Sequence, residues 1–595
     1  MEFTAPKPQH KDAIAAFKLW FEEQTSKSYL DTARFCWPEV QLAMEAKLSN
    51  LYNAILQELV YMRQQRRTQP WLRSVIGMVI TTKEIGILRA DSLGVEQSTF
   101  QKDSSRGVLD IVRICSGLAR STAIHRGQHE AFHLHDTTTL ALPHLKPSSP
   151  DPFIAKEAEM KYTHRTVRFI TLKGNRVHYP KHETQDVTFY VHSLLQDNGS
   201  LIGRCPRIFC VSREVGGDGA TRSFIGPYAL KTYYADHESE CYKEDLIAVA
   251  RQAQVKKLLL PTAEWRYGDA LSMRGFTADV VGKYTDNHVI PNVVSKREEV
   301  FALSDMKRVL AQSSDYAEFS QAFVDFAEAI ASLAENGLAH RDLSIGNVLL
   351  SRDVECPPTF FAEAASSVQE FANRLAVFSP REPDDRVGGI LHDMDMAGRL
   401  RPSRRAKQAP VGDDWLKKMI ETAEVPAASS TAQPVVPQRG FRTGTPPFMA
   451  IQLLINGPPH TVTHDLHSLL FVACLFFWTF PCFVEIPFPG PVPLTARPWP
   501  TEVLRWANRP VSFNLKELGG IKRTFFSHPA DLNAIFKRTL EDDLWLEDVR
   551  YLTLFWELYR VLWAQPTEQT PDETHDKANV DPKELITALE TAAKL

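Results

Sequence analysis

The chain has 595 residues, too many for one hydrophobic core, so two or three domains are expected. Hydrophobic residues make up 44% of it and charged residues 24%, the balance of an ordinary globular protein. The formal net charge of -4 excludes the global basic field that points to nucleic acid, and eight scattered cysteines without a Cys-x-x-Cys pair favour free thiols over a disulfide framework.

The N-terminal part of the chain is predicted to be mostly helical. Residues 12–64 place apolar side chains such as Tyr52 and Met62 on one face of a helix. Residues 75–132 continue in mixed, mainly helical segments. We therefore expect residues 1–150 to form a mostly helical region, and they carry no motif that assigns the region a role.

From about residue 158 the pattern changes to strands. TVRFITL and NRVHYPKHE flank Lys173-Gly174-Asn175, which predicts a β-hairpin. DVTFYVHSLL, RIFCVSREV and YALKTYY are further strand candidates, and a helix is expected after them over ESECYKEDLIAVARQAQVKKLLL. This order predicts a β-rich lobe over residues 158–310.

Helices are predicted for most of the remaining chain. A long helix is expected over Asp315–Glu335, because its apolar side chains form one stripe and Asn336-Gly337 supplies a stop signal. The apolar run Leu469–Phe480 is too short for a bilayer core of about 30 Å, so it predicts a buried core helix. We expect a helical lobe over residues 311–565 and a polar C-terminal tail over 566–595.

The most informative stretch is HRDLSIGNVLL, residues 340–350. It places Asp342 five residues before Asn347, directly after His-Arg and directly before an apolar run. In such a pair the Asp accepts or orients the proton of an attacking hydroxyl, and the Asn carbonyl reaches a metal held by nucleotide phosphates. On its own the motif also fits a surface turn between a helix and a strand.

Further motifs occur in the order that this chemistry requires. Downstream, GILHDMD delivers Asp393 after an apolar run, as expected for a metal-binding carboxylate, and GTPPFMA is a candidate end of an activation segment. Upstream, Lys231 lies in a predicted strand, and the helix after it carries Glu240 and Glu244. An ion pair with one of these carboxylates would aim the Lys at phosphate oxygens.

The sequence resembles the eukaryotic protein kinase-like superfamily, and specifically the fungal-type protein kinase family. The segments that carry the resemblance are HRDLSIGNVLL (340–350), GGILHDMDMAG (388–398), RTGTPPFMAIQLL (442–454) and HDLHSLLFV (464–472). The resemblance implies an α+β, bilobal protein kinase-like fold with a β-rich N-lobe and a helical C-lobe. It also implies transfer of the γ-phosphoryl group of ATP, with Mg2+, to Ser/Thr hydroxyls of a protein substrate.

The resemblance implies a role for the residues of the second lobe. Asp342 resembles the catalytic Asp, and Asn347 resembles a magnesium ligand. Asp393 resembles the principal magnesium ligand. His340 would pack in the core behind the site, anchored near Asp465, which opens the apolar helix.

The residues expected around the nucleotide in the first lobe follow from the same resemblance. Lys231 looks like the Lys that contacts the α- and β-phosphates. Glu244 is its preferred ion-pair partner and Glu240 the alternative. The phosphates would lie under a loop that contains Ile202 and Gly203.

The sequence also departs from the general kinase pattern. No Gly-x-Gly-x-x-Gly loop precedes Lys231, Asp395 replaces the Gly of Asp-Phe-Gly, and Gln452 replaces the Glu that closes the activation segment. These departures keep a pseudokinase that serves as a binding scaffold open as an alternative. A small-molecule kinase of the same superfamily is the third possibility, although the segment ending in GTPPFMA argues against it.

A competing signal lies in the first part of the chain. His129-Glu130-Ala131-Phe132-His133 matches the zinc-hydrolase pattern H-E-x-x-H, but accidental spacing is the better interpretation because no third ligand is compelling. An apolar signal segment is absent from the N-terminal residues, so we expect an intracellular protein, cytoplasmic or nuclear, that binds neither nucleic acid nor a membrane.

Overall fold

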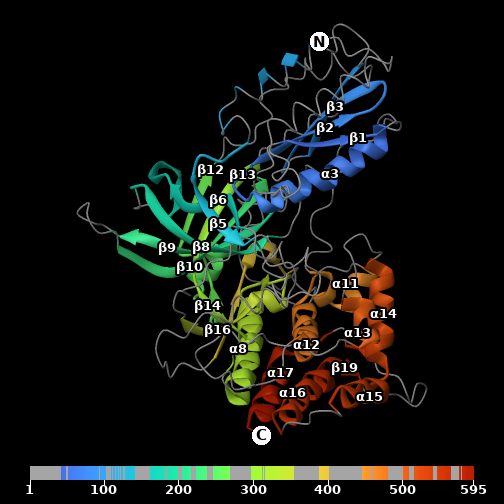
Figure 1. Ribbon diagram of the computed structural model, residues 1–595. Helices are drawn as coiled ribbons and strands as arrows, with labels where there is room; N and C mark the ends of the chain where they lie inside the picture. The colour runs from blue at the N-terminus through green and yellow to red at the C-terminus, as the bar shows by residue number, and fades with distance from the viewer. Residues whose placement is uncertain are drawn as a thin grey trace, which may run out of the picture.

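The computed structural model describes most of the chain beyond residue 41. Three parts follow one another down Figure 1: an N-terminal unit with α3, a sheet-rich middle part and a helical part that contains the C-terminus. The described residues are 42–47, 51–92, 94–101, scattered positions within 109–124, 127–140, 161–180, 184–197, 204–215, 223–236, 246–267, 297–310, 313, 315–353, 388–400, 445–456, 460–479, 500–507, 515–540, 546–564, 575–577 and 579–594.

The N-terminal unit is a four-stranded sheet with one long helix. Its elements are β1 (Ala43–Ala46), α3 (Leu51–Thr68), β2 (Ser74–Ile80), β3 (Glu84–Asp91) and β4 (Val95–Gln101). The sheet order is β1-β2-β3-β4, with β1 parallel to β2 and the other pairs antiparallel. The helix predicted up to residue 64 is confirmed in α3, whereas the mainly helical prediction is wrong for the strands β2, β3 and β4. Short apolar runs fit both a buried strand and a helix, and pairing between strands decides for the strand.

The helix α3 packs on the sheet through part of the predicted face, since Met62 faces the core and Tyr52 does not. Tyr52 is 68% exposed, whereas Glu58 and Met62 are fully buried. Glu58 lies over Gly77, where a Cβ atom would come within 2.3 Å of Glu58 Oε1, so a larger residue at this position would force the Glu58 side chain to shift. Burial and the neighbouring Glu45 carboxylate raise the pKa of Glu58 to about 8.

Glu58 therefore predicts a stability that falls as the pH rises. Between about pH 4.5 and about pH 8 the unfolded chain releases a proton that folded Glu58 keeps, so each step up in pH favours unfolding. We expect Glu58→Gln to melt at a higher temperature than the wild type at pH 8, with a smaller gap at pH 5. Melting curves at pH 5, 6.5 and 8 test this. The exposed position Glu590→Gln is the control, and a Glu58→Gln advantage that does not grow with pH contradicts the assignment.

The middle part is one eight-stranded sheet. Its strands are β5 (Phe132–Leu140), β6 (Lys161–Leu172), β7 (Val177–Tyr179), β8 (Val187–Asp197), β9 (Arg207–Val215), β10 (Ser223–Asp236), β12 (Ala263–Tyr267) and β13 (Arg297–Asp305). The order across the sheet is β5-β6-β8-β9-β10-β13-β12-β7. The strands predicted over DVTFYVHSLL, RIFCVSREV and YALKTYY are confirmed as β8, β9 and β10.

The hairpin predicted around Lys173-Gly174-Asn175 is wrong. The strand β6 pairs with β8, and β7 crosses to the far edge of the sheet, where it pairs with β12. A short 3-10 turn at Gly174–Arg176 redirects the chain between β6 and β7. The helix predicted after β10 is present where it is described, over residues 246–252, and the strand β11 (Leu258–Leu259) replaces its predicted end.

The N-terminal unit and the eight-stranded sheet share one apolar core and a set of buried polar contacts. Arg73 Nε donates to Glu299 Oε2 at 2.9 Å, and Arg207 Nη1 donates to the carbonyl oxygen of Pro70 at 2.9 Å. The guanidinium of Arg66 lies over the ring of Tyr234, 5.4 Å from its centroid. The unit is therefore fastened to the sheet by both apolar packing and charge-assisted hydrogen bonds.

The H-E-x-x-H segment belongs to this junction, and its two histidines do not share the helical face that a zinc-hydrolase motif requires. His129 is buried beside the sheet, where its Nδ1 accepts the backbone N–H of Ala131 and its Nε2 lies 3.1 Å from Glu299 Oε2. His133 lies on β5, on a strand rather than a helix, and contacts Thr171. Among the described residues, no group of three or more His, Cys, Asp or Glu side chains is arranged to hold a metal ion.

The third part is a helical lobe around a large apolar core. Its helices are α8 (Tyr316–Glu335), α11 (Ile451–Asn456), α12 (Val462–Thr479), α13 (Thr501–Ala507), α14 (Leu515–Ser527), α15 (Pro529–Leu540), α16 (Leu546–Leu562) and α17 (Pro582–Ala593). The predicted helix over 315–335 is confirmed as α8, where the Asp315 side chain caps the N-terminus and Gly337 follows the end with φ of 71°.

The apolar run that opens at Asp465 is confirmed as a core helix. Along α12 nearly every side chain from Leu466 to Trp478 is fully buried, so the helix is apolar all round because other helices surround it. No described helix is long and apolar enough to cross a membrane.

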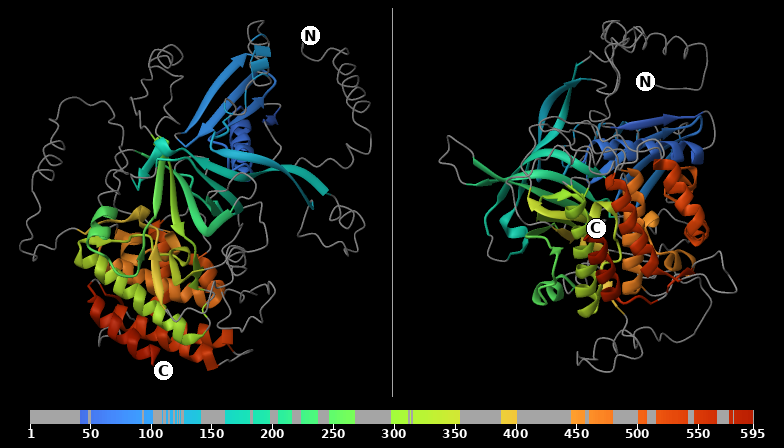
Figure 2. Two further views of the ribbon diagram at one scale, coloured as in Figure 1. Left: turned by 90° about the vertical axis from the view of Figure 1, so that its left-hand side faces the viewer. Right: turned by 90° about the horizontal axis from the view of Figure 1, so that it is seen from below.

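The predicted polar C-terminal tail is wrong for residues 582–593. These residues form α17, which packs against α8 and α16 and lies beside α8 in the two views of Figure 2. Leu585 and Leu589 are fully buried there, and the Tyr316 hydroxyl donates to the carbonyl oxygen of Ala592 at 3.0 Å. The polar composition describes only the exposed face of an amphipathic helix. The other domain boundaries stay predictions.

Candidate functional site

The loop from His340 to Asn347 runs between two short strands, β15 (Leu338–Ala339) and β16 (Val348–Asp353). The buried carboxylate of Asp465, at the start of α12, holds the beginning of this loop. Asp465 Oδ2 accepts the backbone N–H of His340 at 2.8 Å, and Oδ1 accepts that of Arg341 at 2.9 Å. His460 Nε2 lies 2.9 Å from the same Oδ1. The two loop amides therefore have an acceptor inside the core, which fixes where the loop begins.

Arg341 adopts a left-handed backbone conformation with φ of 68°, which turns the loop toward the site. Its guanidinium lies against Gly398, where an added Cβ would come within 2.0 Å of the guanidinium carbon. Arg341 Nη2 donates to the carbonyl oxygen of Arg399 at 3.1 Å. The segment that follows Asp395 is therefore tied to the same loop.

The side chain of Asp342 is held from one side. Its Oδ1 accepts the backbone N–H of Thr445 at 2.8 Å and the Thr445 hydroxyl at 2.9 Å. Asn347 Nδ2 donates to the backbone carbonyl oxygen of Asp342 at 2.7 Å, so the amide oxygen of Asn347 faces elsewhere. Burial and the nearby Asp393 carboxylate raise the pKa of Asp342 above its ordinary value, despite the Thr445 hydrogen bonds.

Asp393 follows β17 (Gly389–His392) and also has a left-handed backbone conformation, with φ of 71°. The carbonyl oxygen of His392 lies 2.9 Å from His340 Nε2, which joins the two loops of the site. Burial and the Asp395 charge would raise the pKa of Asp393, but Lys231 outweighs them and holds it below its ordinary value. Asp393 is therefore an ionised carboxylate inside the protein.

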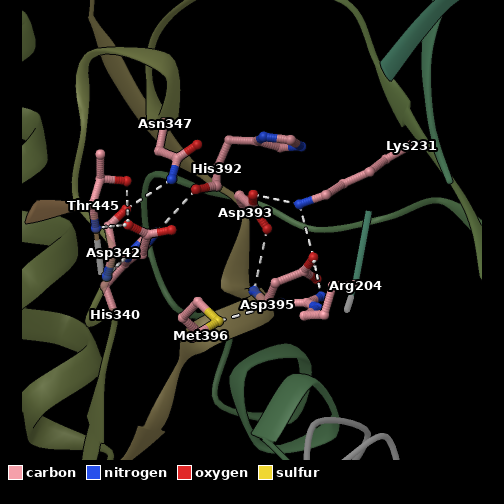
Figure 3. A network of polar contacts seen from close by, with 10 residues as sticks. All are labelled: Arg204, Lys231, His340, Asp342, Asn347, His392, Asp393, Asp395, Met396 and Thr445. Carbon is pink, nitrogen blue, oxygen red and sulfur yellow. Dashed lines mark hydrogen bonds and ion pairs between the residues drawn. The ribbon is translucent and has the colours of Figure 1, made fainter. Parts of the chain in front are cut away.

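The side chain of Lys231 reaches from β10 to the Asp393–Asp395 turn (Figure 3). Its Nζ lies 2.5 Å from Asp393 Oδ2 and 2.7 Å from Asp395 Oδ2. Arg204 Nη2 lies 2.6 Å from the same Asp395 oxygen. Burial would lower the pKa of Lys231, but the two carboxylates outweigh burial and raise it. Two cations and two carboxylates thus form one compact, charge-balanced network.

Not every predicted site residue lies within the described part of the chain. Glu244, its alternative Glu240, and the loop residues Ile202 and Gly203 fall outside it, so the predicted ion pair and phosphate loop stay predictions. The helix at residues 246–252 is described, and its Leu246 packs with Met394 in a small apolar cluster. The structure brings Lys231 and Asp393 into contact, and it places Asp342 beside Asn347.

A cavity of about 30 Å³ lies next to this network. Eleven residues line it: Ile208, Ala229, Lys231, Ile247, Pro261, Ala302, Ser304, His392, Asp393, Met394 and Asp395. The apolar side chains of β9, β10 and β13 form one wall and the charged turn forms the other. Sites for ligands the size of a nucleotide measure about 300–1,000 Å³, so the described cavity is smaller than such a site, and we call the arrangement in which Lys231 contacts Asp393 and Asp395 the closed arrangement.

Two contacts of the site have no signal in the sequence motifs. In one, Asp342 accepts two hydrogen bonds from Thr445, which lies 103 positions later in the sequence. The other is Lys522 on α14, a fully buried amine that donates to the carbonyl oxygens of Pro447 and Met449 at 2.8 and 2.7 Å. Spacing in the sequence identifies neither, since both depend on how the helical lobe packs.

A family model matches the part of the chain that carries the second half of this site. Residues 272–478 match the family model described as fungal protein kinase. The resemblance to the fungal protein kinase family is confirmed. The matched segment contains Asp342, Asn347, Asp393 and Asp465, whereas Lys231 and Arg204 precede it. Together with the sheet-rich and helical lobes, the match makes the chain kinase-like in fold, as predicted.

Two further comparisons add little. A solved structure of vaccinia related kinase 3 is similar at 11% sequence identity, over 70% of this chain and 90% of that chain, with a TM-score of 0.31. No curated protein matches the sequence.

The Asp465 anchor gives a stability prediction. Asp465→Asn keeps the size of the side chain but removes a buried acceptor from a backbone N–H or from His460, so we expect the free energy of unfolding to fall by about 2 kcal/mol. The pKa of Asp465 lies below its ordinary value, so this contribution is present above about pH 4 and is lost as the pH falls through the folded pKa.

Urea denaturation at pH 7 and pH 3 measures both effects. Asp186→Asn is the control, because Asp186 pairs with Lys173 at 2.7 Å on the surface, where about half of each side chain is exposed. We expect little change from the control, since exposed ion pairs contribute little. Equal stability of Asp465→Asn and wild type at pH 7 would contradict the anchoring role.

Proposed function

We propose that this protein is an ATP-dependent protein kinase that transfers the γ-phosphoryl group of Mg-ATP to Ser/Thr hydroxyls. The observation that supports the proposal most is the convergence of Asp342, Asp393 and Lys231 from three distant parts of the chain (Figure 3). Phosphoryl transfer requires little covalent chemistry from the protein, so positioning and charge neutralisation are its main contributions.

The donor atoms at the site fit a magnesium ion. Asp393 offers an ionised carboxylate, and the amide of Asn347 uses its nitrogen on Asp342, which leaves its oxygen for a metal. Hard cations such as Mg2+ prefer these oxygen ligands and usually complete their coordination with phosphate oxygens and water. A bound Mg2+ would neutralise charge on the transferred phosphoryl group.

Asp342 is the proposed base that receives the substrate hydroxyl. Both Thr445 hydrogen bonds fall on Oδ1, so Oδ2 is the atom that an incoming hydroxyl would meet. The pKa of the carboxyl group is raised by burial and by Asp393, which makes it a better proton acceptor than an ordinary Asp. In the proposed reaction Asp342 orients the hydroxyl oxygen toward the phosphorus and holds its proton.

The segment that begins at Thr445 favours a protein substrate. Thr445 contacts Asp342 directly, and the 3-10 turn Pro446–Phe448 after it is tied to the helical lobe by Lys522. A segment fixed in this way next to the base offers a docking edge for a peptide near the hydroxyl that reacts. The choice of Ser/Thr over Tyr rests on the family resemblance.

A catalytically weak pseudokinase that serves as a scaffold is the second candidate. The observation that favours it is the closed network, in which Lys231 is held by Asp393 and Asp395 beside a cavity of about 30 Å³. A small-molecule kinase of the same superfamily is the third candidate. It would phosphorylate metabolite hydroxyls in preference to peptides.

The test is transfer of labelled γ-phosphate from Mg-ATP to peptides that carry Ser, Thr or Tyr. We expect the wild type to label Ser and Thr peptides and Asp342→Asn to lose at least 100-fold in rate, since a positioned base contributes about 10²–10⁴. Asp186→Asn, a surface carboxylate far from the site, should retain the wild-type rate. Equal labelling by wild type and Asp342→Asn would refute the proposal, and binding of ATP without transfer would support the pseudokinase.

A further inference from the structure

The carboxylate of Asp395 occupies an unusual place in the site. It stands at the position where kinases commonly have the glycine that follows their metal-binding Asp, and it points back into the charged network (Figure 3). A single oxygen, Oδ2, lies 2.7 Å from Lys231 Nζ and 2.6 Å from Arg204 Nη2. Two cations that converge on one anionic oxygen are the arrangement by which proteins hold a phosphate oxygen.

Contacts with neighbouring residues hold Arg204 in this position. Its backbone carbonyl oxygen accepts the N–H of Tyr234 at 2.8 Å, which ties it to β10 three residues beyond Lys231. Its guanidinium lies over the ring of Tyr233, 4.7 Å from the centroid, and Nη1 contacts Met396 Sδ at 3.2 Å. About a third of the side chain remains exposed, so a ligand has access to it.

We propose that the Asp395 carboxylate is an internal stand-in for a nucleotide phosphate, and that Arg204 and Lys231 are the cation pair that binds this phosphate when Asp395 leaves. This inference rests on the proposed nucleotide site. In this proposal Arg204 binds the phosphate in place of a Gly-rich loop, which the sequence lacks before Lys231. A phosphate, with more negative charge than a carboxylate and several acceptor oxygens, would bind both cations at once.

The network of Arg204, Lys231, Asp393 and Asp395 is balanced in charge. The closed network holds two positive and two negative groups, with less than a fifth of each of the Lys231, Asp393 and Asp395 side chains exposed. If a phosphate displaced Asp395 from the cations, that carboxylate would need solvent or a cation in their place. Each nucleotide that binds must therefore compete with Asp395. The apparent affinity for the nucleotide equals the intrinsic affinity multiplied by the fraction of molecules in which Asp395 does not occupy the two cations.

Calorimetric titration of the full chain with ADP, with and without Mg2+, and with adenosine tests the inference. We expect Asp395→Asn to lower the Kd for ADP at least tenfold, because the amide no longer competes for the cations. Arg204→Ala should raise the Kd for ADP about tenfold, and Arg204→Lys should restore part of the loss. Adenosine carries no phosphate, so neither substitution should change its Kd.

Matched controls separate this effect from a general loosening of the protein. Asp186→Asn removes another Lys–Asp pair of the same 2.7 Å length, and Arg538→Ala removes an exposed ion pair of α15. Neither should change the Kd for ADP. Parallel shifts for ADP and adenosine in the Arg204 or Asp395 variants would overturn the inference, because a phosphate contact cannot act on adenosine.

The outcome is distinguishable from failure of the kinase proposal. Tighter ADP binding by Asp395→Asn without phosphotransfer by the wild type would support the stand-in and refute the kinase. Phosphotransfer that depends on Asp342, with unchanged or weaker ADP binding by Asp395→Asn, would refute the stand-in and support the kinase. Absence of ADP binding to the wild type and to every variant would overturn both.

Discussion

The site depends on one buried carboxylate, Asp465. Burial of a charged group is costly unless hydrogen bonds compensate for it, and Asp465 is compensated by two backbone amides of the His340–Arg341 loop and by His460. The compensation acts in both directions. The loop satisfies the carboxylate, and the carboxylate fixes the loop, so Asp342 emerges one residue later at a defined place. The core helix α12 therefore positions Asp342, although α12 itself lies in the apolar core.

A second constraint is the balance of charge in the closed network. Lys231 is held by Asp393 and Asp395 in the described structure, and its predicted partner Glu244 lies outside the described residues. A buried cation takes whichever carboxylate the packing brings within reach, and here the turn after β17 brings two. The mutual neutralisation in this network explains how four charged side chains tolerate partial burial.

The sequence predicted the helical lobe well and the N-terminal unit poorly, for physical reasons. The helix α8 has a single apolar stripe, a capping Asp315 and a terminal Gly337, so local signals agree with the fold. The strand β2 reads SVIGMVI, which fits a helix equally well until its partners β1 and β3 are known. Asp342, Asn347 and Asp393 could be picked out because their spacing reflects chemistry. The contacts of Thr445 and Lys522 could not, because they join segments far apart in the chain.

The N-terminal unit, whose role the sequence left open, reaches the strand that carries Lys231. Glu299 on β13 accepts the Arg73 hydrogen bond from that unit and lies directly opposite Tyr234 on β10. Arg66 of α3 lies over the ring of the same Tyr234, whose backbone N–H in turn binds Arg204. Burial of Glu299 would raise its pKa, but His129 and Arg73 outweigh burial and lower it to about 2, so this carboxylate remains charged under the sheet. The unit thus supports β10, the strand that carries Lys231 and that donates the Tyr234 N–H to the carbonyl oxygen of Arg204.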